Sequence, residues 1–154
     1  MYFVDRSQIE RRLAFLDVLA QGCKELMEAS PTDGSDRRQA DNPLPLLAAL
    51  AQERLLHLAI ETVTDVGSLL IDAFILRDAS SYEDIIDILL DEQVISEGLH
   101  TTLYALVKLR KPLVQDYADW NRDELHPALR PLPEVFILFR ESVKTFIDKE
   151  PIGL

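Results

Sequence analysis

Apolar residues recur every three or four positions along most of this chain, which is the spacing that places side chains on one face of an α-helix. The first such pattern follows Asp5 and Ser7, either of which can cap a helix, and ends near Ser30. Its apolar positions are Ile9, Leu13, Leu16, Ala20, Cys23 and Met27. The pattern predicts a first amphipathic helix that packs into a helical bundle.

A second, longer helix is expected from Leu44 to about Arg77, and it should be the most buried element because it is apolar around most of its circumference. Its polar residues nevertheless follow one another at steps of three or four, so they share one face. They are Arg54, His57, Glu61, Asp65, Ser68 and Asp72. Two interpretations remain open: a solvated face supported by pairs between successive turns, or the wall of a polar cleft.

The second half of the chain predicts three more helices. A capping box of Ser80 and Glu83 opens a short helix, Ser96 caps a longer one, and the last helix follows Pro133. The helix after Ser96 carries a heptad stripe of Leu99, Leu103, Leu106, Arg110, Leu113, Tyr117 and Trp120. No strand is predicted. The expected fold is all-α, an up-and-down helical bundle of about four main helices plus one or two short helices.

A chain of 154 residues and 17.5 kDa is long enough for one domain with its own core, so residues 1–154 are expected to form a single domain. Residues 30–43, SPTDGSDRRQADNP, are polar and have no hydrophobic period. We interpret them as a mobile loop between the first and second helices. Because 47% of the residues are hydrophobic, the bundle has more apolar surface than one core consumes, which favours a homodimer.

The charge balance restricts the partners that the chain can attract. Sixteen Lys and Arg residues against 27 Asp and Glu residues give a formal charge of −11, which argues against broad, salt-driven attraction to nucleic acid or anionic membrane. No signal-like segment and no apolar stretch of about 20 residues is present, so no membrane association is expected. The single cysteine cannot form an internal disulfide. These features predict a cytoplasmic protein.

The segment RKPLVQDY, residues 110–117, breaks the apolar pattern of its helix. Arg110 and Tyr117 occupy stripe positions that should be apolar, and core positions rarely take arginine without a partner. On a continuous helix the two side chains would lie about 20° apart in azimuth and roughly 10 Å apart in rise, so both could contact one ligand. Pro112 predicts a kink, which could turn Gln115 toward Arg110.

A local cationic patch accompanies this segment, because Lys108 and Lys111 flank Arg110. Exposed charges more than about 8 Å apart are largely screened at physiological salt, so a compact basic patch can persist in an acidic protein. We therefore regard Lys108 and Lys111 as candidate ligand-binding residues, together with Arg54, His57, Glu61 and Asp65 of the polar face on the second helix.

Residues 110–117 resemble the signature of the HepT-like branch of the HEPN superfamily, which reads arginine, four residues, histidine, one residue, tyrosine. The opening MYFVDRSQIERRLAFL and residues 53–89 also resemble that family, so the likeness covers most of residues 1–120. It implies an all-α homodimer in which the motifs of both subunits meet in a cleft. It also implies RNA cleavage that requires neither metal nor cofactor.

The resemblance further implies a toxin–antitoxin pair, in which the partner is an MNT-type nucleotidyltransferase antitoxin. Carried over to this sequence, Arg110 would hold a phosphate or the charge of the transition state. Tyr117 would be the tyrosine that the partner modifies by adenylylation. The position of the motif histidine is occupied by Gln115.

Gln115 changes what the motif can do chemically. RNA cleavage by attack of a 2′-hydroxyl requires one group to accept a proton and another to donate one, and a glutamine amide does neither. Loss of a general acid or base costs roughly 10²- to 10⁴-fold in rate. The sequence therefore predicts a ribonuclease-type protein that is weakly active or inactive and binds an anion, a nucleotide or RNA in the dimer cleft.

The chain has three histidines that could substitute for the missing one. His57 lies on the polar face of the second helix, but a lone helical histidine is more often a surface or structural residue. His100 and His126 are expected to face solvent. No pair of them has the spacing of metal ligands, so no metal site is expected.

Alternatives to catalysis remain open from the sequence. Arg110 could instead pair with Glu61 or Asp65 of the second helix and fix the register of the bundle. The chain could also be a non-catalytic module that binds an MNT-type nucleotidyltransferase, or a stand-alone dimer with a structural or regulatory role.

Overall fold

The computed structural model describes residues 5–30 and 44–149, and every regular element in these two ranges is helical. The longer helices are α1 (Arg6–Ala29), α2 (Leu46–Ala73), α4 (Glu97–Lys108) and α6 (Leu132–Lys149). The shorter ones are α3 (Tyr82–Asp91), α5 (Arg110–Val114) and the 3₁₀ turn η2 (Tyr117–Asp119). The all-α prediction is confirmed. The predicted mobile loop lies outside the described residues, except for Ser30.

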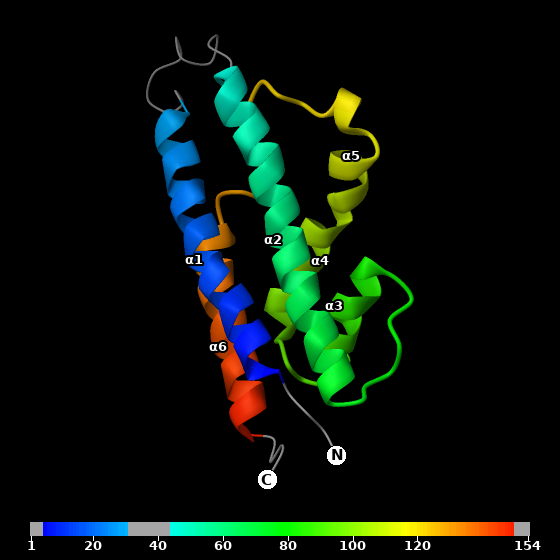
Figure 1. The fold of residues 1–154 in the computed structure, drawn as a ribbon. Coiled ribbons are helices and arrows are strands. Elements are labelled where there is room, and N and C mark those ends of the chain that lie inside the picture. Colours follow the sequence, from blue (N-terminus) through cyan, green and yellow to red (C-terminus); the bar gives the residue numbers. More distant parts are fainter. Residues whose placement is uncertain (1–4, 31–43, 150–154) are drawn as a thin grey trace.

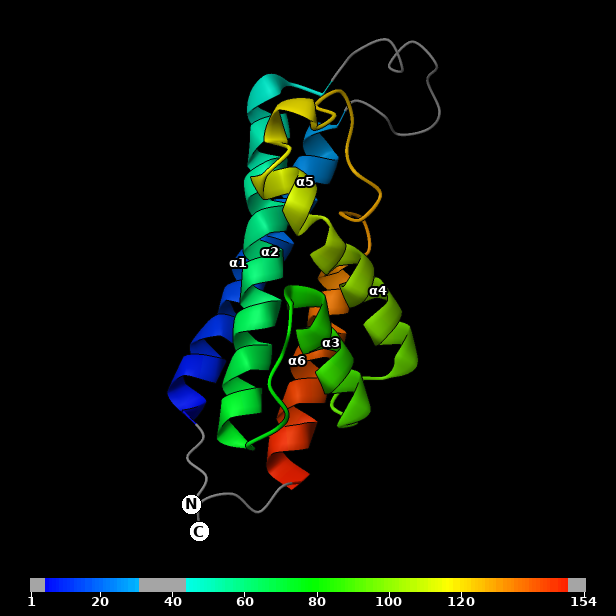
Figure 2. The same ribbon diagram turned by 90° about the vertical axis from the view of Figure 1, so that its right-hand side faces the viewer.

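The longer helices run alternately in opposite directions, as in an up-and-down bundle (Figures 1 and 2). Helix α1 packs against both α2 and α6, and α3 lies in contact with α2 and α4. Helix α2 stands at the centre, and its buried side chains include Leu56, Ile60, Val63 and Leu70, each 0% exposed. Full burial of one such side chain contributes about 1.5–3 kcal/mol, so α2 is the main contributor to the core, as predicted.

Helix α1 follows its sequence pattern with one correction. Asp5 caps it by accepting a hydrogen bond from the Gln8 amide, as expected. In its second half Leu19, Cys23 and Leu26 are buried, so Cys23 is placed as predicted, whereas the predicted Ala20 and Met27 are only half-buried. A straight helix has 3.6 residues per turn, so a stripe extrapolated at seven-residue steps drifts off the buried face within a few turns.

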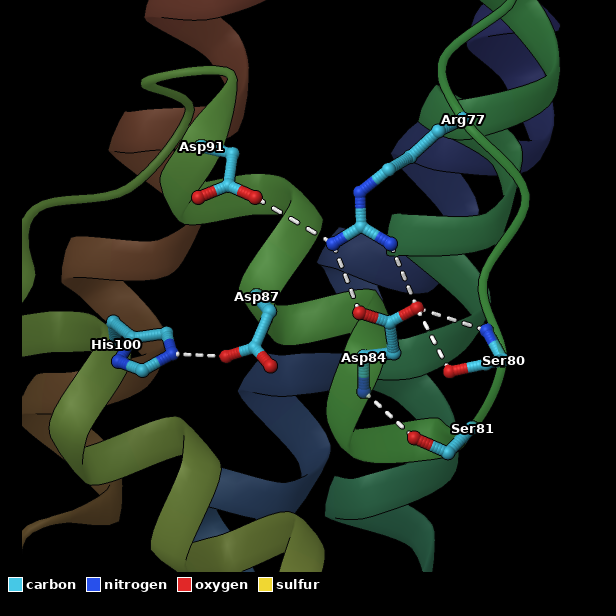
Figure 3. Close-up of polar contacts among 7 residues, drawn as sticks. All are labelled: Arg77, Ser80, Ser81, Asp84, Asp87, Asp91 and His100. Atoms are coloured by element: carbon cyan, nitrogen blue, oxygen red, sulfur yellow. Dashed lines mark hydrogen bonds and ion pairs between the residues drawn. The ribbon is translucent and has the colours of Figure 1, made fainter.

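The loop between α2 and α3 is held by one carboxylate (Figure 3). Arg77 donates to both oxygens of Asp84 at 2.8 and 2.9 Å and also lies 3.5 Å from Asp91. The backbone amide and hydroxyl of Ser80 donate to the same Asp84 carboxylate at 2.9 and 3.1 Å. The loop is therefore pinned to the first turn of α3.

The predicted capping box of α3 is displaced by one residue. The N-cap is Ser81, whose hydroxyl accepts from the Asp84 amide at 3.0 Å. Ser80 lies one residue before the N-cap, and its hydroxyl donates to the Asp84 side chain instead.

The helix predicted after Ser96, with a kink at Pro112, is broken into separate elements in the structure. Helix α4 ends at Lys108, α5 is a single short turn, and Tyr117 begins η2. Pro112 lacks an N–H and crowds the carbonyl of Lys108, four residues earlier, so the helix breaks there and resumes with a bond from Leu113 N to Leu109 O of 3.0 Å. Arg110 and Tyr117 consequently lie on different elements.

Substitution Asp84→Asn tests the loop anchor. Hydrogen bonds from Arg77, and then from Ser80, hold the pKa of Asp84 well below its usual range, so the folded protein gains stability from this group at neutral pH. That gain is present above the pKa of an unfolded aspartate, about 3.9, and disappears as the pH falls below it. Thermal melts should show the variant less stable than the wild type at pH 7, with the gap closing in acid.

The exposed Asp78 of the same loop provides the control, and Asp78→Asn should leave the melting temperature nearly unchanged at both pH values. A pH-independent difference between wild type and Asp84→Asn would show that the carboxylate charge does not stabilise the loop.

Candidate functional site

Glu61 of α2 connects two groups of the candidate site. Its Oε1 accepts a hydrogen bond from Arg110 Nε at 3.3 Å and lies 3.4 Å from His57 Nε2, one helical turn earlier. The side chains of Arg110, His57 and Glu61 are 31%, 31% and 32% exposed, so each is partly ordered by its neighbours but remains accessible from solvent. The result is a shallow polar site between α2 and α5.

Tyr82, the first residue of α3, forms the other wall of this site. The Arg110 guanidinium lies 4.0 Å from the centre of the Tyr82 ring, a cation–π geometry that further fixes the arginine. Gly67 makes this possible, because a Cβ at that position would collide with Cγ2 of Ile85 where α3 packs closely on α2. Arg110 is therefore held by α2 and α3 together.

The other charged candidates do not join the site. Asp65 pairs with Arg12 of α1 at 3.4 Å, which contradicts the alternative that it pairs with Arg110. Arg54 and Lys111 are exposed, and the Lys108 ammonium lies 5.3 Å from the Tyr104 ring. The polar face of α2 is thus mostly a solvated face, and only its middle, at His57 and Glu61, borders the arginine.

Tyr117 and Gln115 are both exposed, Tyr117 by 59%. The prediction that the Tyr117 phenol lies along a buried stripe beside Arg110 is wrong for this chain alone, because α5 ends before it. The backbone of Tyr117 is nevertheless fixed. Its carbonyl accepts a hydrogen bond of 2.8 Å from Arg122 Nη2.

Arg122 and Glu53 form an ion pair beside the candidate site that the sequence did not reveal. Arg122 donates to both oxygens of Glu53 at 2.7 and 2.9 Å, and the Glu53 side chain is only 15% exposed. Glu53 lies one turn before His57 on α2, so the four-residue spacing could have predicted that Glu53 belongs to the same polar face. Arg122 follows the motif in a segment without periodicity, and nothing in the sequence pattern could pair the two.

A pocket of about 270 Å³ lies beside α5, lined by Pro112, Asp116, Asp119, Trp120, Glu124 and His126, among others. Its lining has three carboxylates and no Lys or Arg, so electrostatics oppose an anion there. The predicted anion site is therefore better matched by Arg110 than by this pocket.

His100 and His126 do not face solvent freely, in contrast to the prediction. His126 stacks on Trp120 at 5.4 Å between ring centres, and burial lowers its pKa. His100 Nε2 lies 2.7 Å from Asp87 Oδ1, linking α4 to α3 (Figure 3). Both histidines are occupied by contacts within the bundle.

Neither a metal centre nor a membrane span is found in residues 5–30 and 44–149. Within these ranges no three His, Cys, Asp or Glu side chains are grouped so that they could hold a metal ion. No helix there is both long and apolar enough to cross a bilayer. Cys23 is buried, and burial raises its pKa to about 11, so it is not a reactive thiol.

Comparison with known proteins identifies the class. The family model described as "Ribonuclease HepT-like" matches residues 33–142. Over 150 residues the chain is 34% identical to the Bacillus subtilis (strain 168) protein named "Putative RNase YutE", covering 97% of this chain and 94% of that protein. The fold is a helical HEPN-type ribonuclease domain. The chain belongs to the HepT-like ribonuclease family.

Solved structures agree with this assignment. The structure of YutE from Bacillus subtilis, described as a cytosolic protein of unknown function, has a TM-score of 0.78 at 33% identity and covers 100% of this chain and 98% of that one. A toxin–antitoxin crystal structure with AMP-PNP has a TM-score of 0.71 at 20% identity, covering 89% of this chain and 97% of that one.

A third structure is the tri-AMPylated Shewanella oneidensis HEPN toxin in complex with its MNT antitoxin. Its TM-score is 0.69 at 19% identity, and it covers 89% of this chain and 96% of that chain. At these identities the two toxin–antitoxin structures show a shared fold and nothing more.

The Arg122–Glu53 contact predicts that Arg122→Met releases residues 117–120 from α2. Loss of a hydrogen-bonded charge in a half-buried position should lower the free energy of unfolding by about 1–3 kcal/mol, measured by denaturant titration. Amide exchange at residues 117–120 should accelerate. Arg130→Met, at an exposed arginine, should change neither. Unchanged exchange in Arg122→Met would contradict the anchoring role.

Proposed function

We propose that this protein binds RNA at the Arg110 site and cleaves it slowly without a metal ion, as a homodimer whose two sites face a common cleft. Membership of the HepT-like ribonuclease family supports the reaction class. The observation that carries the proposal is Arg110, oriented by Glu61 and Tyr82 yet 31% exposed. An ordered and accessible guanidinium is suited to a phosphodiester, which it can bind through two parallel hydrogen bonds.

Only part of the Arg110 guanidinium is committed to the protein. The hydrogen bond to Glu61 uses Nε, and the face of the group rests on Tyr82, so the terminal nitrogens remain available to a ligand. The Glu61 carboxylate offsets some of the positive charge, which favours weak and reversible RNA binding. The slow rate follows from Gln115, since the amide at the motif position cannot donate a proton to the leaving oxygen as a general acid would.

Variant Arg110→Ala tests this proposal. Removing a group that stabilises charge in the transition state should reduce the rate by about 10²-fold, measured by single-turnover cleavage of a labelled RNA in EDTA. Arg130→Ala, at an exposed arginine, is the matched control and should cleave like the wild type. Equal RNA affinity and equal rate in wild type and Arg110→Ala would refute the site.

A second candidate function is a partner-binding module for an MNT-type nucleotidyltransferase, with Tyr117 as the adenylylation target. The favouring observation is the Tyr117 side chain, which is 59% exposed while its backbone is held by Arg122. A fixed, accessible phenol suits modification by another protein. The proposed homodimer and a cytoplasmic location are compatible with both functions.

Co-expression with an MNT-type nucleotidyltransferase should add AMP to Tyr117. Intact-mass and peptide mass spectrometry would locate the adduct, and Tyr117→Phe should abolish it because the hydroxyl nucleophile is gone. Tyr104, which is half-buried against Lys108, serves as the internal comparison and should stay unmodified. An adduct on a different residue, or none in an active co-complex, would contradict this function.

A further inference from the structure

We infer that His57 is the proton acceptor of the Arg110 site. It would do the work of the motif histidine, whose position is occupied by Gln115. This inference rests on the proposed RNA cleavage. It arises from the position of His57 on α2, which brings a titratable ring to the same carboxylate oxygen that orients Arg110.

The geometry joins the two groups through Glu61. Arg110 Nε and His57 Nε2 lie 3.3 and 3.4 Å from one oxygen, Oε1, so a single phosphodiester is large enough to contact both side chains. The carboxylate favours the tautomer that carries its proton on Nε2. Nδ1 is then left as the proton acceptor, on a side chain that is 31% exposed.

Accessibility separates His57 from the other two histidines of the chain. Its side chain is 31% exposed and borders the open site. His126 already accepts a hydrogen bond at Nδ1 from the Ala128 amide, and its ring is stacked on Trp120. His100 is committed to Asp87 between α3 and α4. Only His57 shares a carboxylate with the arginine.

The charges around His57 come from several helices. On α2 itself, Glu61 is in contact, and Glu53 lies one turn earlier, neutralised by Arg122 from the loop before α6. Helix α5 contributes Arg110, and α3 contributes the Tyr82 ring beneath it. On the α1 side, Arg12 is paired with Asp65, two turns after His57. Glu61 is thus the carboxylate in contact with the ring.

The proposed step balances without another reactant. His57 Nδ1 takes the proton of the 2′-hydroxyl as the 2′-oxygen forms a bond to phosphorus. The bond from phosphorus to the 5′-oxygen breaks, and a water molecule protonates the leaving oxygen. The hydroxide formed takes the proton back from His57, so water and the neutral histidine are both restored. The products are a 2′,3′-cyclic phosphate and a 5′-hydroxyl. Arg110 stabilises the charge on the phosphoryl oxygens throughout.

Substitution His57→Gln tests the inference. Glutamine keeps a polar side chain beside Glu61 but cannot accept a proton at neutral pH, so the single-turnover rate should fall about 10²-fold or more while RNA affinity stays unchanged. The pH dependence of the rate should differ between the wild type and His57→Gln, because the variant lacks the proton acceptor. His100→Gln, which removes another histidine bound to a carboxylate, should retain both the rate and the pH profile of the wild type.

The outcomes separate the inference from the function it rests on. If Arg110→Ala loses cleavage but His57→Gln retains the rate and its pH dependence, His57 is not the acceptor and the Arg110 site stands. Weaker RNA binding by His57→Gln with an unchanged single-turnover rate would also overturn the inference. Absence of cleavage by the wild type would overturn the proposed function and this step with it.

Discussion

The carboxylate of Glu61 organises the candidate site of this bundle. Glu61 lies on the most buried helix, so core packing fixes the position of its backbone. Its carboxylate binds Arg110, which lies 49 residues later in the chain, and contacts His57, one helical turn earlier. Without it, Arg110 would be a long, mobile cation on a short helix. With it, the guanidinium is ordered before any ligand arrives, which lowers the entropy cost of binding.

A pair of this kind adds little to stability, because partly exposed ion pairs typically contribute no more than about 1 kcal/mol. Its partial exposure suits the proposed binding of RNA. A fully buried arginine would be unreachable, and a fully exposed one would be disordered and screened. Tyr82 also keeps Arg110 partly exposed and ordered, because its ring covers one face of the guanidinium. Gly67 allows α3 to approach α2 closely enough for that contact.

Pro112 separates the arginine from the tyrosine of the motif. The break after Lys108 and the end of α5 at Val114 direct the chain into η2, so Tyr117 projects outward while Arg110 stays against α2. Arg122 then ties this segment back to Glu53. One motif thereby presents two chemically distinct surfaces: an ordered cation suited to a phosphodiester, and an accessible phenol suited to another protein.

Hydrophobic periodicity by itself determined the number of long helices, the approximate ends of α1, α2 and α6, and most of the core stripe, because burial of a helical face depends on spacing that is local in sequence. It also placed His57 and Glu61 on one face of α2. Only the tertiary structure decided that Glu61, rather than Asp65, receives Arg110, and that Ser81 caps α3. Those choices depend on which side chains meet across helices. Such contacts are set by packing distances and by the helix break at Pro112, and no periodic pattern encodes them.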